Sequence, residues 1–147
     1  MTAIRTILLA EDSPHDAEMA IDALRDAHLV NPIVHVEDGV ETLDYLFRRG
    51  KYADRPEGDP AVLLLDIKMP RMDGLEVLKE LREHESLRRM PVVILSSSRE
   101  ENDLARSWDL GVNAYVVKPA DFAELTEAMR LLARYWFRFV ELPPPKS

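Results

Sequence analysis

Short apolar runs alternate along the chain with longer stretches whose apolar positions recur every three or four residues. Runs of four or five apolar residues are typical of strands buried on both faces of a parallel sheet, and the longer stretches of amphipathic helices. The predicted strands span residues 6–10, 33–36, 62–65, 91–96 and 114–118. The predicted helices follow them, over about 13–28, 38–47, 73–81, 98–111 and 121–139.

Each predicted helix begins with Ser or Asp and carries Asp or Glu three residues later, the spacing of a capping box. The five pairs are Ser13 and Asp16, Asp38 and Glu41, Asp73 and Glu76, Ser98 and Glu101, and Asp121 and Glu124. Five strand–helix units in series predict an α/β fold, a parallel sheet with right-handed crossovers and helices on both faces. The Gly-, Pro- and charge-rich residues 50–60 are predicted to be an exposed loop, because the core pattern resumes directly after them.

Composition narrows the class of protein. A length of 147 residues suits one domain, and the absence of cysteine excludes disulfides and thiolate metal sites. A net charge of −8 argues against direct nucleic-acid binding, which needs a basic surface. No apolar run approaches the ~20 residues of a membrane span, and the N-terminus lacks a signal peptide, so we expect a cytoplasmic protein with no membrane partner.

Polar side chains follow four of the five predicted strands. Glu11 and Asp12 follow the first strand and Asp66 the third, Ser96 ends the fourth, and Lys118 ends the fifth. In open α/β sheets the carboxyl ends of the strands form the ligand-binding edge, so these side chains are expected to converge.

The expected chemistry is phosphoryl transfer. Clustered carboxylates suit Mg²⁺, which prefers oxygen ligands and lowers the repulsion that an incoming phosphoryl group meets. Asp66 is then the candidate nucleophile, with Lys118 and Ser96 as partners for phosphoryl oxygens. A cis peptide bond before Pro119 would fix the direction of the lysine, and about 5–6% of X–Pro bonds in folded proteins are cis.

With these elements in place, residues 5–138 resemble a two-component response-regulator receiver domain. The matching positions are Glu11-Asp12, Asp66 in Leu65-Asp66-Ile67-Lys68-Met69-Pro70, Asp73-Gly74, Ser96, Tyr115 and Lys118-Pro119. The resemblance implies a flavodoxin-like fold with five parallel strands in the order 2-1-3-4-5, an order that a well-known member of the family exemplifies.

The resemblance also implies a role for each residue. Asp66 is the implied phosphoacceptor for a partner histidine kinase, and Glu11, Asp12, Asp66 and the backbone carbonyl of Lys68 are the implied Mg²⁺ ligands. Lys118 and Ser96 are the implied phosphoryl contacts, and Ser96 and Tyr115 the implied switch residues.

Within that family, the loop at 50–60 and the aromatic extension at 135–143 are most similar to single-domain regulators of bacterial phytochromes. This implies a stand-alone protein: one receiver domain over 1–147, with a core at 5–138 and an extension at 139–147. It also implies a bacterial phytochrome kinase as the partner. The chain itself would then be a switch rather than an enzyme.

The last predicted helix carries more apolar surface than one sheet needs. One stripe comprises Phe122, Leu125, Met129, Leu132 and Trp136, and a second comprises Ala128, Leu131 and Tyr135. The excess predicts a homodimer through residues 98–139. The alternative is that the C-terminal extension folds back and covers the second stripe.

Two other functions are compatible with parts of the pattern. A haloacid-dehalogenase-like phosphatase also uses an aspartyl-phosphate, but it needs an acid two residues after the nucleophile, where this chain has Lys68. A non-phosphorylated interaction module of the same fold is expected to lack Asp12, Asp66 or Lys118, and all three are present.

Lys68 and Ser98 lie where they could flank an attacking water, which leaves the lifetime of the phosphorylated form open.

Overall fold

The computed structural model describes residues 5–27, 29–141 and 143, except for the side chains of Arg138 and Phe139. Its five strands form one parallel sheet in the order β2-β1-β3-β4-β5, as expected. The strands are β1 (Ile7–Ala10), β2 (Ile33–Val36), β3 (Val62–Leu65), β4 (Val92–Ser96) and β5 (Ala114–Val117).

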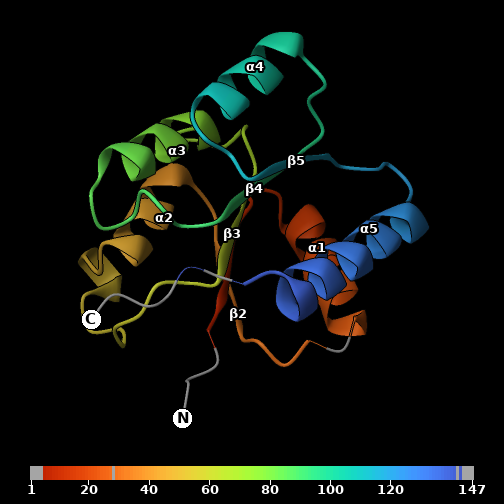
Figure 1. The fold of residues 1–147 in the computed structure, drawn as a ribbon, viewed down its shortest axis with the longest axis horizontal. Helices are drawn as coiled ribbons and strands as arrows, with labels where there is room; N and C mark the ends of the chain where they lie inside the picture. Colours follow the sequence, from red (N-terminus) through yellow and green to blue (C-terminus); the bar gives the residue numbers. More distant parts are fainter. Residues whose placement is uncertain (1–4, 28, 142, 144–147) are drawn as a thin grey trace.

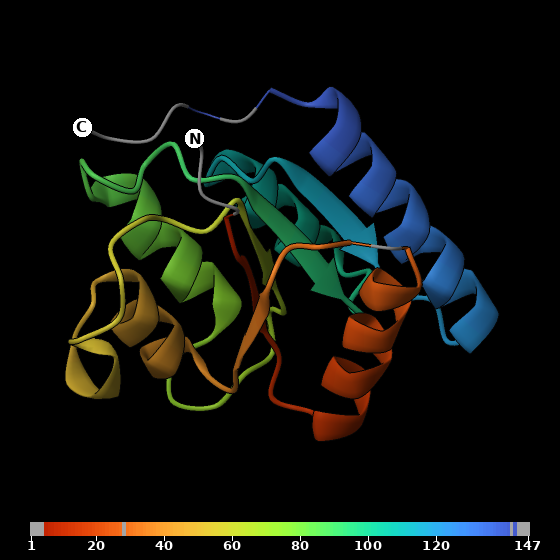
Figure 2. The same ribbon diagram turned by 90° about the horizontal axis from the view of Figure 1, so that it is seen from below.

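Helices cover both faces of the sheet (Figure 1). They are α1 (Pro14–Asp26), α2 (Gly39–Leu46), α3 (Gly74–Glu83), α4 (Glu101–Asp109) and α5 (Phe122–Arg134). Figure 2 shows α1 and α5 side by side on one face and α2 with α3 on the other. The predicted end of the first helix at about His28 falls at a residue outside the described ones, and the described helix ends at Asp26. The doubly wound α/β architecture is therefore confirmed.

The alternation of side chains along β1 and β3 divides the core into two parts. Leu8, Leu63 and Leu65 pack with apolar residues of α2 and α3. Ile7, Leu9 and Leu64 pack with α1 and α5 on the other face. Both strands are buried at every position, which explains why they read as unbroken apolar runs. Their carboxyl ends are held rigidly by this packing.

Four of the five predicted capping boxes have the expected hydrogen bond. Ser13, Asp38, Asp73 and Asp121 each accept the backbone N–H of the acidic residue three positions later. The prediction for Ser98 and Glu101 is wrong, because α4 begins two residues later than a Ser98 cap requires. The Ser98 hydroxyl instead donates to Asp103 Oδ2 (2.7 Å) and accepts from Glu100 N (3.2 Å).

The C-terminal helix continues past α5 as a π-helical turn, η2 (Tyr135–Phe139), close to its predicted end. Leu125, Met129 and Trp136 of the first predicted stripe are buried, whereas Phe122 of the same stripe is half exposed in the first turn of α5. Leu131 and Tyr135 of the second stripe are 56% and 61% exposed.

The C-terminal extension turns back toward the amino ends of the strands, where Arg5 Nη1 donates to the carbonyl of Pro143 (3.3 Å). Leu142 and residues 144–147 of the predicted extension lie outside the described residues. The described part of the extension leaves Leu131 and Tyr135 exposed, so it does not cover the second stripe.

The predicted loop at 50–60 is mostly exposed but has local structure. It opens with a 3₁₀ turn, η1 (Gly50–Tyr52), and Arg55 stacks on the ring of Tyr45 (4.3 Å to the centroid).

Among the helices of the described residues, none combines the length and apolar character that a membrane crossing requires.

Candidate functional site

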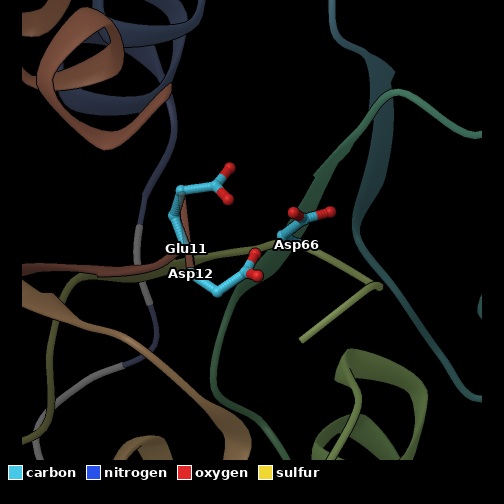
Figure 3. A group of neighbouring side chains, drawn as sticks. All are labelled: Glu11, Asp12 and Asp66. Carbon is cyan, nitrogen blue, oxygen red and sulfur yellow. The ribbon is translucent and has the colours of Figure 1, made fainter. Parts of the chain in front are cut away.

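Three carboxyl groups meet at the carboxyl edge of the sheet. Glu11 and Asp12 directly follow β1, and Asp66 directly follows the neighbouring β3. Asp66 N donates to the carbonyl of Ala10 (3.0 Å), which fixes the two strand ends side by side. One oxygen from each of the three side chains lies within 4.8 Å of the others. Figure 3 shows the three neighbouring side chains. We call Glu11, Asp12 and Asp66 the acidic triad.

The acidic triad fits a hard divalent cation. Carboxylate oxygens are the ligands that Mg²⁺ prefers, and this ion retains several waters and uses few protein ligands. Asp12 is exposed while Glu11 and Asp66 are 3% and 8% exposed, so an ion held here keeps a side open to water. Such a cation would neutralise part of the charge that accumulates when a phosphoryl group approaches Asp66.

Lys118 reaches into the acidic triad from the end of β5. Its ammonium lies 2.5 Å from Glu11 Oε1, 3.0 Å from Asp16 Oδ2 and 3.7 Å from Asp66 Oδ2. The lysine side chain is only 10% exposed. Burial by itself lowers the pKa of Lys118, but the hydrogen bonds to Glu11 and Asp16 and the charges of Asp66 and Glu11 together raise it. The lysine therefore stays cationic beside Asp66.

Glu11 is the electrostatically perturbed member of the triad. Burial raises its pKa to about 7, and the charge of Asp66 adds to the rise, against the hydrogen bond from Lys118. The second carboxylate oxygen of Glu11, Oε2, accepts the backbone N–H of Ser13 (3.1 Å). A hydrogen bond also joins the backbone carbonyl of Glu11 to His35 Nε2 (2.7 Å). The Glu11 carboxyl is thus fixed in direction, and its ionisation is disfavoured by burial and by the charge of Asp66 even with Lys118 beside it.

Ser96 lies at the end of β4, which pairs with β3, and Tyr115 lies on the neighbouring β5. Ser96 is buried at the end of β4, and its hydroxyl accepts the N–H of Ser98 (3.2 Å). The Tyr115 hydroxyl donates to the carbonyl of Ser98 (2.9 Å), and burial raises its pKa. The two side chains therefore meet the same residue of the loop that joins β4 to α4.

The loop after Asp66 is held by close backbone packing and by an ion pair. A Cβ at Gly74 would collide with the carbonyl oxygen of Asp66, so this position requires glycine. Arg71 has a left-handed backbone (φ 65°) and binds both carboxylate oxygens of Asp38 at 3.0 and 3.1 Å. The loop that contains Lys68 is thereby tied to the start of α2.

The structure brings Glu11, Asp12, Asp66 and Lys118 together, and Ser96 and Tyr115 meet at Ser98 in the loop after β4. The side chain of Lys68 is exposed, and the proposed metal-binding role of its carbonyl stays a prediction. The peptide bond before Pro119 is trans, as are the other peptide bonds of the described residues. Asp16, interpreted only as a capping residue, also pairs with Lys118. Its place in the first turn of α1 was the available signal, because that turn lies at the sheet edge.

The comparisons with known proteins agree with this geometry. Residues 7–130 match the response regulator receiver domain family. The chain is 32% identical over 139 residues to response regulator Rcp1 of Synechocystis sp., covering 95% of this chain and 93% of that protein.

Solved structures of phytochrome response regulators are also similar. The phosphorylated cyanobacterial phytochrome response regulator RcpA superimposes with a TM-score of 0.90 at 36% identity, covering 97% of this chain and 100% of that one. The bacteriophytochrome response regulator AtBRR gives 0.78 at 48% identity, covering 95% and 99%. The Mn²⁺-bound form of Rcp1 gives 0.88 at 32% identity, covering 95% and 99%. The chain therefore belongs to the response regulator receiver domain family, with the phytochrome response regulators among its similar relatives.

Proposed function

We propose that this chain is a response regulator that accepts a phosphoryl group on Asp66 from a partner histidine kinase in a Mg²⁺-dependent reaction. The observation that carries the proposal is the meeting of a buried Asp66 with Glu11, Asp12 and Lys118 at one edge of the sheet. No single one of these residues is specific, but together they supply a nucleophile, cation ligands and a fixed positive charge.

In the proposed reaction an Asp66 carboxylate oxygen attacks the phosphorus atom of a phosphohistidine. The new P–O bond forms as the P–N bond breaks, and the imidazole nitrogen keeps the electron pair and takes up a proton. Lys118, 3.7 Å from Asp66 Oδ2, is placed to pair with an oxygen of the transferred group. Glu11 and Asp12 would hold the Mg²⁺ that supplies the remaining charge neutralisation.

Incubation with acetyl phosphate, followed by intact mass measurement, tests the proposal. We expect one phosphoryl adduct on the wild type with Mg²⁺, and none with EDTA or on Asp66→Asn. An adduct that survives the substitution, or no adduct on the wild type, would contradict the assignment of Asp66.

A phytochrome histidine kinase is the proposed phosphoryl donor. The support is the similarity, over nearly the whole of each relative, to proteins named as cyanobacterial phytochrome and bacteriophytochrome response regulators. A phosphorylated bacteriophytochrome kinase should transfer to this chain faster than an unrelated histidine kinase does. Equal transfer from both kinases would remove this part of the proposal.

A homodimer through residues 98–139 remains our proposal for the output surface. Support comes from the exposed apolar side chains within these residues, Trp108, Phe122, Leu131 and Tyr135. Light scattering should show a dimer for the wild type and a monomer for Leu131→Glu. A wild type that stays monomeric, with and without beryllofluoride as a phosphoryl mimic, would refute the dimer.

We propose a switch rather than an enzyme, and Lys68 is the residue that supports this proposal. A phosphatase of the haloacid-dehalogenase type needs a carboxylic acid there, and the side chain is an exposed lysine. Incubation with phosphoserine or a sugar phosphate should accordingly release no phosphate catalytically.

A further inference from the structure

Lys118 donates hydrogen bonds to two carboxylates, one directly after β1 and one in the first turn of α1. Nζ donates to Glu11 Oε1 (2.5 Å) and to Asp16 Oδ2 (3.0 Å). An ammonium group has three donors, so one N–H remains on the side of Asp66, whose Oδ2 is 3.7 Å away. The pair with Asp16 thus uses one donor and orients another toward the reacting carboxylate.

The two partners of Lys118 differ in whether a bound cation would also bind them. Glu11 is a member of the acidic triad, so a bound cation and Lys118 would compete for the same carboxylate. Asp16 is not a member of the triad, and its carboxylate stays available to the lysine when a cation is present. Asp16 is therefore the partner that can hold Lys118 in the metal-loaded protein.

The local sequence explains why Asp16 can reach the lysine. Ser13 caps α1 and Pro14 opens it, which places Asp16 at the third helical position. Side chains of a helix tilt toward its N-terminus, and the N-terminus of α1 lies at the edge that carries the acidic triad. The cap itself uses only the backbone N–H of Asp16, so the carboxylate is free to serve Lys118.

We infer that Asp16 is a positioning residue for phosphoryl transfer, which holds Lys118 toward Asp66 once a cation occupies the acidic triad. The inference rests on the proposed function and deepens it. Asp16 touches neither Asp66 nor the transferred group; it acts through the lysine. The alternative is a purely structural role, in which the charge of Asp16 only stabilises the N-terminus of α1, as acids in a first helical turn often do.

The first test is the rate of phosphoryl uptake from acetyl phosphate at saturating Mg²⁺. For Asp16→Asn we expect a fall of about two- to fivefold, the range that a partly exposed ion pair supports. Asp16→Glu, which can still reach the lysine, should recover most of the rate. Glu76→Gln is the matched control, because Glu76 occupies the same capping position in α3 and is exposed. Its rate should equal that of the wild type.

The second test does not depend on phosphorylation. The ammonium protons of Lys118 can be followed by ¹H–¹⁵N NMR, because protons held in hydrogen bonds exchange slowly with water. In the wild type the signal should persist with and without Mg²⁺. In Asp16→Asn it should persist without the metal, held by Glu11, and disappear when Mg²⁺ is added. A purely helix-capping role predicts no such metal-dependent loss.

These outcomes distinguish a failure of the proposed function from a failure of the positioning role of Asp16. No uptake by the wild type contradicts the proposed function, and the NMR result then still decides the role of Asp16. Normal uptake by the wild type with an equal or faster rate for Asp16→Asn overturns the positioning role. A Lys118 signal that survives Mg²⁺ in Asp16→Asn overturns it as well.

Discussion

Replacing Glu11 with glutamine should remove a large pH dependence of stability from the metal-free protein. The pKa of Glu11 is raised from an ordinary 4.5 to about 7, chiefly by burial. The folded state therefore binds more protons than the unfolded state between these values. Stability from this group is fully present below an unfolded pKa of 4.5 and is lost as pH rises through about 7.

The magnitude follows from the two pKa values. Between about pH 5 and about pH 8, the Glu11 contribution to the free energy of unfolding falls by about 2–3 kcal/mol. Lys118 does not change this slope: its pKa is raised from 10.5, so its contribution is constant below that pH. The difference between the wild type and Glu11→Gln cancels the contributions of groups that titrate alike in both proteins.

Urea denaturation in EDTA, at several pH values for both proteins, measures the effect. The wild type should lose about 2–3 kcal/mol relative to Glu11→Gln across this range. Because protons and Mg²⁺ compete for Glu11, Mg²⁺ should bind the wild type about tenfold more weakly near pH 6 than near pH 8. Parallel stability curves for the two proteins would refute the account of the triad's electrostatics.

Substitutions at two further positions test how the loop after Asp66 is held. Gly74→Ala forces a Cβ against the carbonyl of Asp66, so thermal denaturation should show a loss of about 1–3 kcal/mol and phosphoryl uptake should slow. An unchanged melting temperature would show that the loop yields freely. Arg71→Ala and Arg71→Gly both lose the ion pair with Asp38, but glycine relieves the left-handed backbone. Arg71→Gly should therefore be the more stable by about 1 kcal/mol in urea denaturation, and the opposite order would contradict the strain argument.

The fold could be predicted because its strands and helix starts have local sequence signals. β1 and β3 are buried on both faces, so their apolar runs are unbroken, and each capping pair lies within four residues. The convergence of Glu11, Asp12, Asp66 and Lys118 followed from one topological rule about strand ends.

The missed features are contacts between residues far apart in the chain. Asp16 and Lys118 are 102 positions apart, and Asp38 and Arg71 are 33 apart. No local pattern distinguishes a first-turn acid that only favours its helix from one that also binds a lysine. The start of α4 was misplaced for a similar reason, since the buried Ser98 is held by Asp103 and by the strand end, and so does not cap the helix where the sequence suggested.

The central claim, that Asp66 is the phosphoacceptor, is tested most directly by locating the modification. Borohydride reduces an aspartyl-phosphate to homoserine, so the protein can be phosphorylated with Mg²⁺ and acetyl phosphate, reduced, digested and sequenced by mass spectrometry. We expect homoserine at position 66 alone, and none when Mg²⁺ is withheld. Homoserine at Asp12 or at any other carboxylate, or none at position 66 in the phosphorylated protein, would contradict the claim.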